Sequence, residues 1–150
     1  MPLLPLLGAM VNGIFGRRIQ ARFGAGAVQA IAVAAMVLAA AATLIAVAKL
    51  EGLPPTERFL LDRRWQIFAL DVLNVDFALA LDPLSAVMAL VITLVGTVIH
   101  VYAIGYMRHE ESAWRFFAYL NLFVFFMLLL VLADSLLLMF FGWEGVGLCS

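Results

Sequence analysis

Apolar runs alternate with short charged stretches along the chain. Charged side chains gather in residues 17–22, 49–82 and 108–115 and at Asp134, and uncharged runs separate these places. An apolar run of about 18 or more residues has no stable place in a small soluble fold and is long enough to cross a membrane. The pattern therefore predicts membrane helices at residues 2–16, 25–48, 83–107, 116–133 and 135–150. The fifth run is short, and it qualifies only if the apolar sequence continues beyond it.

The first apolar run is open to more than one interpretation. Residues 2–16 are followed, not preceded, by Arg17 and Arg18, whereas a secretory signal places its positive charge before the apolar stretch. We expect a short first helix, with a re-entrant or a cleaved segment as the alternatives.

The long connection before residue 83 has the period of a strand. Apolar and other residues alternate over 75–82, and residues 65–70 can supply a partner strand with a turn near 71–74. The pattern predicts a β-hairpin at about 65–81, outside the membrane, and an irregular loop is the alternative. Asp82 and Pro83 suit the N-cap and first turn of the helix that follows.

Composition supports a membrane protein. The hydrophobic share is 66% and the charged share 13%, which leaves too little charge to cover a water-facing surface. A net charge of -1 provides no basic field to attract nucleic acid, and the single cysteine, Cys149, forms no internal disulfide. The expected fold is an all-α integral membrane helix bundle, with about five transmembrane helices and a small hairpin between the second and third.

Arginine and lysine counts predict the orientation. The first connection has three arginines within residues 17–22, and the third has Arg108 and Arg115 within eight residues, whereas the four basic residues of 49–64 are spread out and mixed with acids. Because cytoplasmic loops are enriched in Lys and Arg, we expect the first and third connections inside. The N-terminus and the hairpin then lie outside.

Glu144 is the residue that composition explains least. It lies ten residues after Asp134, which we expect to be the N-cap of the fifth helix, and so about 15 Å deeper in the membrane. An ionised carboxylate there costs on the order of 2.5–3.5 kcal/mol, and a carboxyl lowers this cost by binding a proton or by pairing with a cation. Glu144 is therefore a candidate proton carrier. The alternative is a permanently protonated glutamate that hydrogen-bonds a neighbouring helix.

The surroundings of Glu144 suggest two further features. Gly142, Gly145 and Gly147 lie around the acid, either leaving it accessible or packing against another helix. His100, in the third predicted helix, is expected at a similar depth. If the two helices are neighbours, His100 and Glu144 can exchange protons, and otherwise His100 is a structural hydrogen-bonding group. Asn121, in the fourth predicted helix, is expected to bond between helices.

Several runs of residues resemble one known family. They are LADSLLLM at 132–139, GWEGVGLCS at 142–150, IHVY at 99–102, RFFAYLNLF at 115–123 and PLLG at 5–8. These runs resemble the chain L family of proton-pumping NADH-quinone oxidoreductase, respiratory complex I. The run from 115 to 150 is the most specific, and residues 49–71 are the least similar.

The resemblance implies an antiporter-like membrane domain, of which residues 1–150 are the N-terminal part. In the family, the glutamate that matches Glu144 pairs with a lysine on the seventh helix, and proton pumping is coupled to NADH oxidation and quinone reduction. The family's membrane chain carries no redox cofactor, since NADH, FMN, iron–sulfur clusters and quinone bind other subunits. The implied partners are other membrane subunits, the lipid bilayer and protons. The implied location is the bacterial inner membrane or the mitochondrial inner membrane.

Two other functions stay open from the residues alone. One is the large subunit of a multisubunit Na⁺/H⁺ antiporter, and the other is a membrane scaffold that transports nothing. The sequence ends at Ser150, before the lysine that the resemblance implies. We therefore expect a portion of a longer protein that lacks a complete proton path.

Overall fold

The computed structural model of the chain shows five helices and one hairpin within the residues that it describes. It describes residues 1–54, 58–69, 74–108, 110 and 112–150, and for 62–69 and 74–77 the description covers the backbone only. The elements, in chain order, are α1 (Leu3–Phe23), α2 (Ala25–Glu51), β1 (Leu60–Ala69), β2 (Asn74–Leu81), α3 (Pro83–Tyr106), α4 (Ala113–Leu132) and α5 (Leu136–Cys149). This order confirms the predicted fold class.

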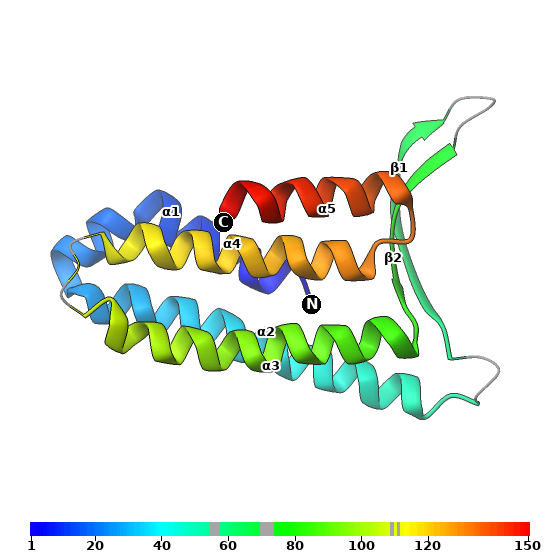
Figure 1. The fold of residues 1–150 in the computed structure, drawn as a ribbon, viewed down its shortest axis with the longest axis horizontal. Helices are drawn as coiled ribbons and strands as arrows, with labels where there is room; N and C mark the ends of the chain where they lie inside the picture. The colour runs from blue at the N-terminus through cyan, green and yellow to red at the C-terminus, as the bar shows by residue number, and fades with distance from the viewer. Residues whose placement is uncertain (55–57, 70–73, 109, 111) are drawn as a thin grey trace.

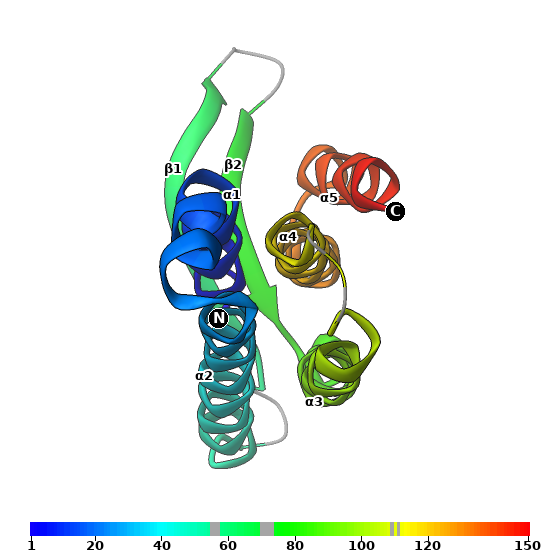
Figure 2. The same cartoon turned by 90° about the vertical axis from the view of Figure 1, so that its left-hand side faces the viewer.

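The first four helices form a four-helix bundle in two layers. α1 and α3 each pack on both α2 and α4 (Figure 1). α5 lies outside this bundle and packs on α4. Seen along the bundle, α4 lies between α3 and α5 (Figure 2). α2, α3 and α4 are long and apolar enough to cross a membrane, and α5 is a shorter apolar helix.

Small residues on α2 let its neighbours come close. Its buried residues include Ala32, Ala35 and Ala39, which recur at three- and four-residue spacing along one face. Without a hydrophobic driving force in lipid, such small residues favour helix association because backbones can approach closely. The outer faces of the helices carry large exposed apolar side chains, such as Leu84 and Val98, as a lipid-facing surface requires.

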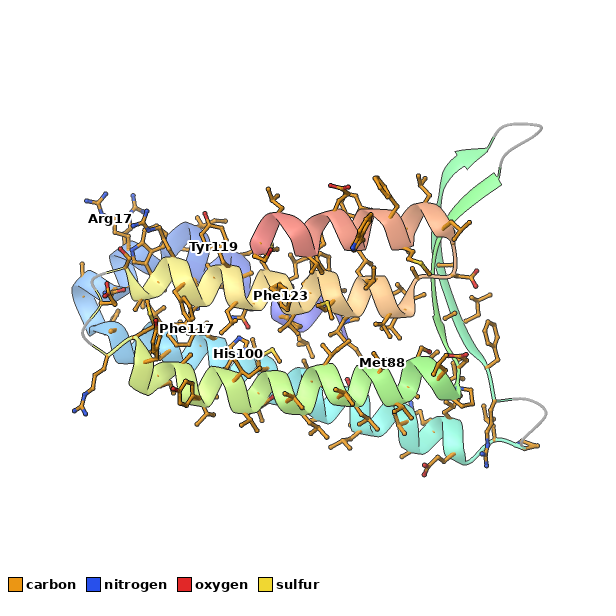
Figure 3. The ribbon with its side chains drawn as sticks, in the orientation of Figure 1. Arg17, Met88, His100, Phe117, Tyr119 and Phe123 are labelled. Carbon is orange, nitrogen blue, oxygen red and sulfur yellow. The ribbon has the colours of Figure 1, made fainter. Side chains whose placement is uncertain are left out.

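α1 is longer than the sequence pattern indicated. It continues past the predicted end at residue 16 and through Arg17, Arg18 and Arg22, because arginine is a good helix former. Only Gly24 separates α1 from α2, and its φ of 82° lies in a region that glycine adopts without strain. Arg17 projects from this end of the bundle (Figure 3).

The predicted hairpin is present and is longer than expected. β1 and β2 pair antiparallel from Leu60 opposite Leu81 to Ala69 opposite Asn74, with irregularities between Arg63 and Trp65 and between Gln66 and Phe68. Of the turn predicted at 71–74, residues 71–73 lie outside the described residues, and Asn74 is the first residue of β2. The hairpin crosses one end of the bundle (Figure 1).

The hairpin is attached to the helices by both backbone and side chains. The Asp134 N–H donates to the Ala78 carbonyl at 3.2 Å, and Leu79 bridges to Ala133 in the connection between α4 and α5. Leu50, Leu81 and Leu132 form a buried cluster beneath it. The hairpin therefore closes the same bundle end at which α2 and α4 finish and α3 and α5 begin.

The start of α3 follows the sequence prediction. The Asp82 carboxylate accepts from the Ser85 N–H at 2.7 Å, and the Asp82 N–H donates to the Ser85 hydroxyl at 2.9 Å. This reciprocal capping box satisfies backbone donors that the helix itself leaves unpaired. The hydrogen bonds from the Ser85 side chain and backbone hold the pKa of Asp82 below its usual value.

α4 and α5 each begin at a residue other than the one expected. α4 starts at Ala113, so Trp114 and Arg115 lie in its first turn, not in the preceding loop. The predicted N-cap Asp134 is wrong, because the Ser135 hydroxyl accepts from the Leu138 N–H at 3.3 Å. Asp134 instead uses its backbone N–H to hold β2.

Candidate functional site

Glu144 lies on a face of α5 that the other described helices leave open. It comes eight residues after Leu136, the first residue of α5, and so about 12 Å along the helix. Its side chain is exposed in this chain. Within the described residues, α4 is the only element on which α5 packs extensively. The acid is thus placed within an apolar helix but turned away from the four-helix bundle.

The glycines around Glu144 explain this direction. A Cβ at Gly142 would lie 2.8 Å from the backbone nitrogen of Leu130, and a Cβ at Gly145 would overlap the ring of Phe126. Both glycines therefore let α5 lie against α4, which supports the packing interpretation of their occurrence. Gly147 differs, since no atom lies within 4 Å of a Cβ placed there. Glu144 points elsewhere because the face with Gly142 and Gly145 is already used.

His100 has the opposite environment. Its side chain is 0% exposed, between α3 and α4 (Figure 3). Its Nδ1 lies 2.7 Å from the Gly96 carbonyl oxygen, one turn earlier in α3. Its Nε2 lies 3.2 Å from Oδ1 of Asn121 on α4, which confirms the expectation that Asn121 bonds between helices. Phe117 packs nearby, with ring centroids 6.4 Å apart.

The structure does not bring His100 and Glu144 together. Asn121, which contacts His100, and Phe126, which contacts α5, are five residues apart, or about 140° around α4 at 100° per residue. The two candidates therefore lie on different sides of α4. The condition that α3 and α5 are neighbours is not met, and direct proton exchange between the two side chains has no geometric support.

Gly8 and Asn12 of α1 also lie in the interior of the bundle, and neither was identified from the sequence as part of the site. A Cβ at Gly8 would lie 2.7 Å from Cβ of Ala35 and 2.8 Å from Nδ2 of Asn121. Asn12, one turn later, is 0% exposed and donates through Nδ2 to the Val28 carbonyl at 3.1 Å. The available signal was their spacing, because residues four apart share a helix face.

Asn12 and Asn121 each have one side-chain atom that is buried and unpaired within the described residues. Within the part of the chain that the structure describes, Oδ1 of Asn12 and Nδ2 of Asn121 are buried and have no hydrogen-bond partner. Buried polar atoms of native proteins usually have partners, because each unpaired one costs about 1–3 kcal/mol. Asn12 and Asn121 are therefore only partly hydrogen-bonded within the described residues of the bundle.

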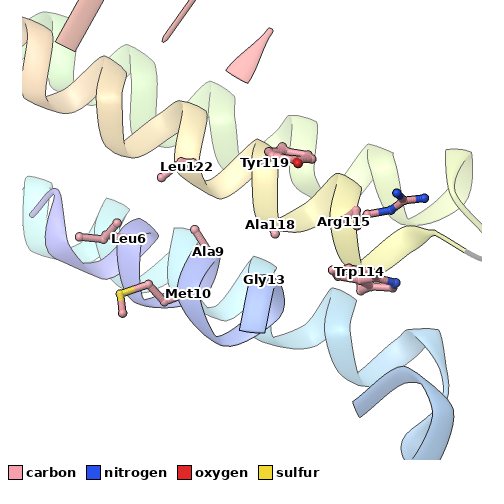
Figure 4. Close-up of a pocket in the computed structure, with 9 residues that line it drawn as sticks. All are labelled: Leu6, Ala9, Met10, Gly13, Trp114, Arg115, Ala118, Tyr119 and Leu122. Atoms are coloured by element: carbon pink, nitrogen blue, oxygen red, sulfur yellow. The ribbon is translucent and has the colours of Figure 1, made fainter. Parts of the chain in front are cut away.

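A separate groove runs along the outside of the bundle between α1 and α4 (Figure 4). Its volume is about 260 Å³, and apolar side chains such as Leu6, Met10 and Leu122 form most of its wall. Arg115 and Trp114 lie at one end, where the guanidinium is 5.6 Å from the centre of the indole. Neither Glu144 nor His100 lines this groove.

Metal ligands do not gather in the described part of the chain. There, no group of three or more His, Cys, Asp or Glu side chains could hold a metal ion. Among the described residues, Glu144 on α5 presents an exposed carboxyl, and His100 contacts Asn121 in the interior.

Comparison with known proteins finds relatives of the chain. Residues 65–117 match the family described as NADH-ubiquinone oxidoreductase (complex I), chain 5 N-terminus. The chain is 38% identical over 148 residues to NADH-ubiquinone oxidoreductase chain 5 of Dictyostelium discoideum, covering 99% of this chain and 21% of that protein.

Bacterial proteins give the same result. NADH-quinone oxidoreductase subunit L of Rickettsia bellii is 38% identical over 148 residues, covering 99% of this chain and 22% of that protein. Subunit L of Escherichia coli K12 is 57% identical over 86 residues, covering 57% of this chain and 14% of that protein. The chain thus spans about a fifth of the length of the relatives that match nearly all of it.

Proposed function

Because the chain belongs to the subunit L and chain 5 family of NADH-quinone oxidoreductase, in its N-terminal portion, we propose that it carries part of a proton pathway through the membrane. NADH oxidation and quinone reduction would take place in other subunits of the complex, which would also hold FMN and the iron–sulfur clusters. The location is a bacterial inner membrane or a mitochondrial inner membrane, as a multi-pass protein.

The observation that carries this proposal is the position of Glu144. An ionisable side chain within an apolar helix is costly, and such side chains in membrane proteins serve mostly in substrate or proton pathways. Glu144 also projects from the side of α5 opposite α4, so a further part of the membrane domain can reach its carboxyl. The resemblance to the family implies that a lysine on a later helix is this partner.

Proton binding by Glu144 follows from two opposing effects. An apolar environment favours the neutral carboxylic acid, whereas a nearby cation favours the carboxylate. Movement of a lysine toward or away from the carboxyl would therefore release or bind one proton. In this proposal the redox reaction supplies the energy for that movement, and Glu144 supplies the proton-binding group.

Glu144→Gln tests the proposal in the complete complex reconstituted into lipid vesicles. Glutamine keeps the shape and hydrogen bonding of the side chain but does not ionise, so fewer protons should cross the membrane per NADH oxidised. Asp134→Asn is the matched control, because Asp134 is an exposed acid beside the same helix. It should pump as the unmodified complex does.

The same experiment separates the proposal from a scaffold function. A scaffold needs no ionisable group at residue 144, so it predicts an unchanged number of protons per NADH in Glu144→Gln. That result, in a complex that assembles and oxidises NADH normally, would contradict the proposal.

A further inference from the structure

The hydrogen bonds of His100 determine where its ring holds hydrogen. A carbonyl oxygen only accepts, so Nδ1, 2.7 Å from the Gly96 oxygen, must carry a hydrogen. In the neutral ring Nε2 then has none and is an acceptor. Nε2 lies 3.2 Å from Oδ1 of Asn121, which is also an acceptor, so this pair forms a hydrogen bond only when the ring is a doubly protonated imidazolium.

The Asn121 amide has a second arrangement that suits the neutral ring. Half a turn about its Cβ–Cγ bond exchanges Oδ1 and Nδ2, so that the NH₂ group donates to a bare Nε2. Nδ2 now has no partner among the described residues, and no hydrogen bond would be broken on the α1 side by this turn. Asn12 is different, because its Nδ2 is already held by the Val28 carbonyl.

Gly8 provides the space for this exchange. A Cβ at residue 8 would lie 2.8 Å from Nδ2 and 3.3 Å from Cγ of Asn121, closer than carbon and nitrogen atoms normally approach. Any other residue there would press on the amide from α1. The glycine is therefore placed where it leaves the amide free on the side away from His100.

No described charge fixes the protonation state of His100 from the neighbouring helices. Besides His100, the buried polar side chains of the helix bundle are uncharged: Asn12 on α1, Gln29 and Thr43 on α2, Ser85 and Thr93 on α3, and Asn121 on α4. Burial disfavours the imidazolium, while the Gly96 and Asn121 oxygens favour it. The orientation of one amide can therefore decide between the two states.

We propose that Asn121 is a reversible partner that lets His100 take up and release one proton inside the bundle. The Asn121 oxygen accepts from Nε2–H of the imidazolium, and after half a turn its NH₂ donates to Nε2 of the neutral ring. Uptake adds one proton and one positive charge to the ring, and no covalent bond other than N–H forms or breaks. This inference rests on the proposed proton pathway and assigns Asn121 as a positioning residue.

The test is nitrogen NMR of the full-length protein with ¹⁵N-labelled histidine. The ¹⁵N shifts distinguish three forms of the ring: neutral with its hydrogen on Nδ1, neutral with its hydrogen on Nε2, and doubly protonated. His100→Gln identifies the signals. The ionised carboxylate of Asn121→Asp offers only acceptors and adds a negative charge, so the imidazolium should persist to higher pH than in the unmodified protein. Asn121→Leu offers neither donor nor acceptor, so the imidazolium should be lost at lower pH. The proton affinity of His100 should differ on the order of 100-fold between the two variants.

Thr93→Val is the matched control. Thr93 is also 0% exposed on α3, and its hydroxyl donates at 2.8 Å to the Ala89 carbonyl in its own helix. The variant should leave the His100 spectrum unchanged. If Asn121→Leu does not fold, the comparison of Asn121→Asp with the unmodified protein decides. Equal proton affinity in the folded proteins, or a neutral ring with its hydrogen on Nε2, would overturn the inference.

The result is independent of the test on Glu144. Glu144→Gln should leave the His100 spectrum unchanged, since the two residues lie on different sides of α4. Loss of pumping in Glu144→Gln together with an unresponsive His100 would reject the role of Asn121 and keep the proposed function. The reverse combination would reject the function of Glu144 and keep the proton-linked exchange at His100.

Discussion

Gly8 determines how closely α1 approaches two other helices at once. Its missing side chain leaves room for Ala35 on α2 and for the Asn121 amide on α4. Close approach of this kind is what small residues provide in helix packing within membranes. At the residue scale, one hydrogen atom in place of a methyl group therefore maintains both the packing of α1 and the space beside Asn121.

Gly8→Ala should destabilise the bundle by about 1–3 kcal/mol, the usual range for overpacking. Thermal unfolding of the purified protein in detergent measures the effect. Adding Ala35→Gly should restore part of the loss, because it removes one of the two collisions and leaves the one with Asn121. Gly26→Ala on α2 is the control, since a Cβ there meets nothing within 4 Å. Equal stability of Gly8→Ala and Gly26→Ala would contradict this interpretation.

At the scale of elements, the contact between α4 and α5 depends on two glycines. A Cβ at Gly142 would approach the backbone of Leu130, which cannot move without displacing α4, and a Cβ at Gly145 would meet the ring of Phe126. This contact sets the rotation of α5 about its axis. It therefore sets the direction in which Glu144 projects.

Gly142→Ala and Gly145→Ala should each lower the unfolding temperature and reduce proton pumping, because α5 must shift and carry Glu144 with it. Gly147→Ala lies on the same helix but meets no atom within 4 Å, so it should have neither effect within this chain. Thermal unfolding and protons per NADH are measured on the same preparations. The packing explanation fails if the three variants behave alike.

Local patterns in the sequence were sufficient to predict most elements. Uncharged runs predicted the apolar helices, and alternation over 75–82 predicted the second strand of the hairpin. The ends of elements were less predictable where charged residues were taken as their boundaries. Arg17 and Arg18 continue α1 because a helix can carry them on its surface, and Ser135 caps α5 although Asp134 is an equally good capping residue by type.

The candidate site was less predictable than the fold. Glu144 and His100 were recognisable as ionisable groups in apolar runs, but their relation was not, because helix order in space depends on packing between distant residues. The glycines that place α5 on α4 and α1 beside Asn121 show their roles only when the opposing atoms are known. Sequence spacing alone does not supply those atoms.

At the scale of the whole molecule, the two ends of the bundle differ in charge and structure. The connections after α1 and after α3 lie at one end, and the hairpin lies across the other (Figure 1). Met1 packs with Leu50, Leu81 and Leu132 beneath the hairpin, so the N-terminus shares the hairpin end. The orientation of these ends in the membrane stays a prediction, with the arginine-rich end inside.

Single cysteines test the orientation in a Cys149→Ser background. Glu110→Cys, in the third connection, should react with a membrane-impermeant maleimide from the cytoplasmic or matrix side. Phe59→Cys, just before β1 and 53% exposed, should react from the opposite side. Labelling of both residues from the same side, or the reverse pattern, would show that the predicted orientation is wrong.

The central claim is that the Glu144 carboxyl binds and releases a proton while the complex works. Infrared difference spectroscopy detects this directly, because a protonated carboxyl has a C=O stretching band that an ionised carboxylate lacks. When NADH is added to the complex, we predict a change in a carboxylic acid band that is absent from Glu144→Gln and retained in Asp134→Asn. An identical band in the unmodified complex and in Glu144→Gln would contradict the account.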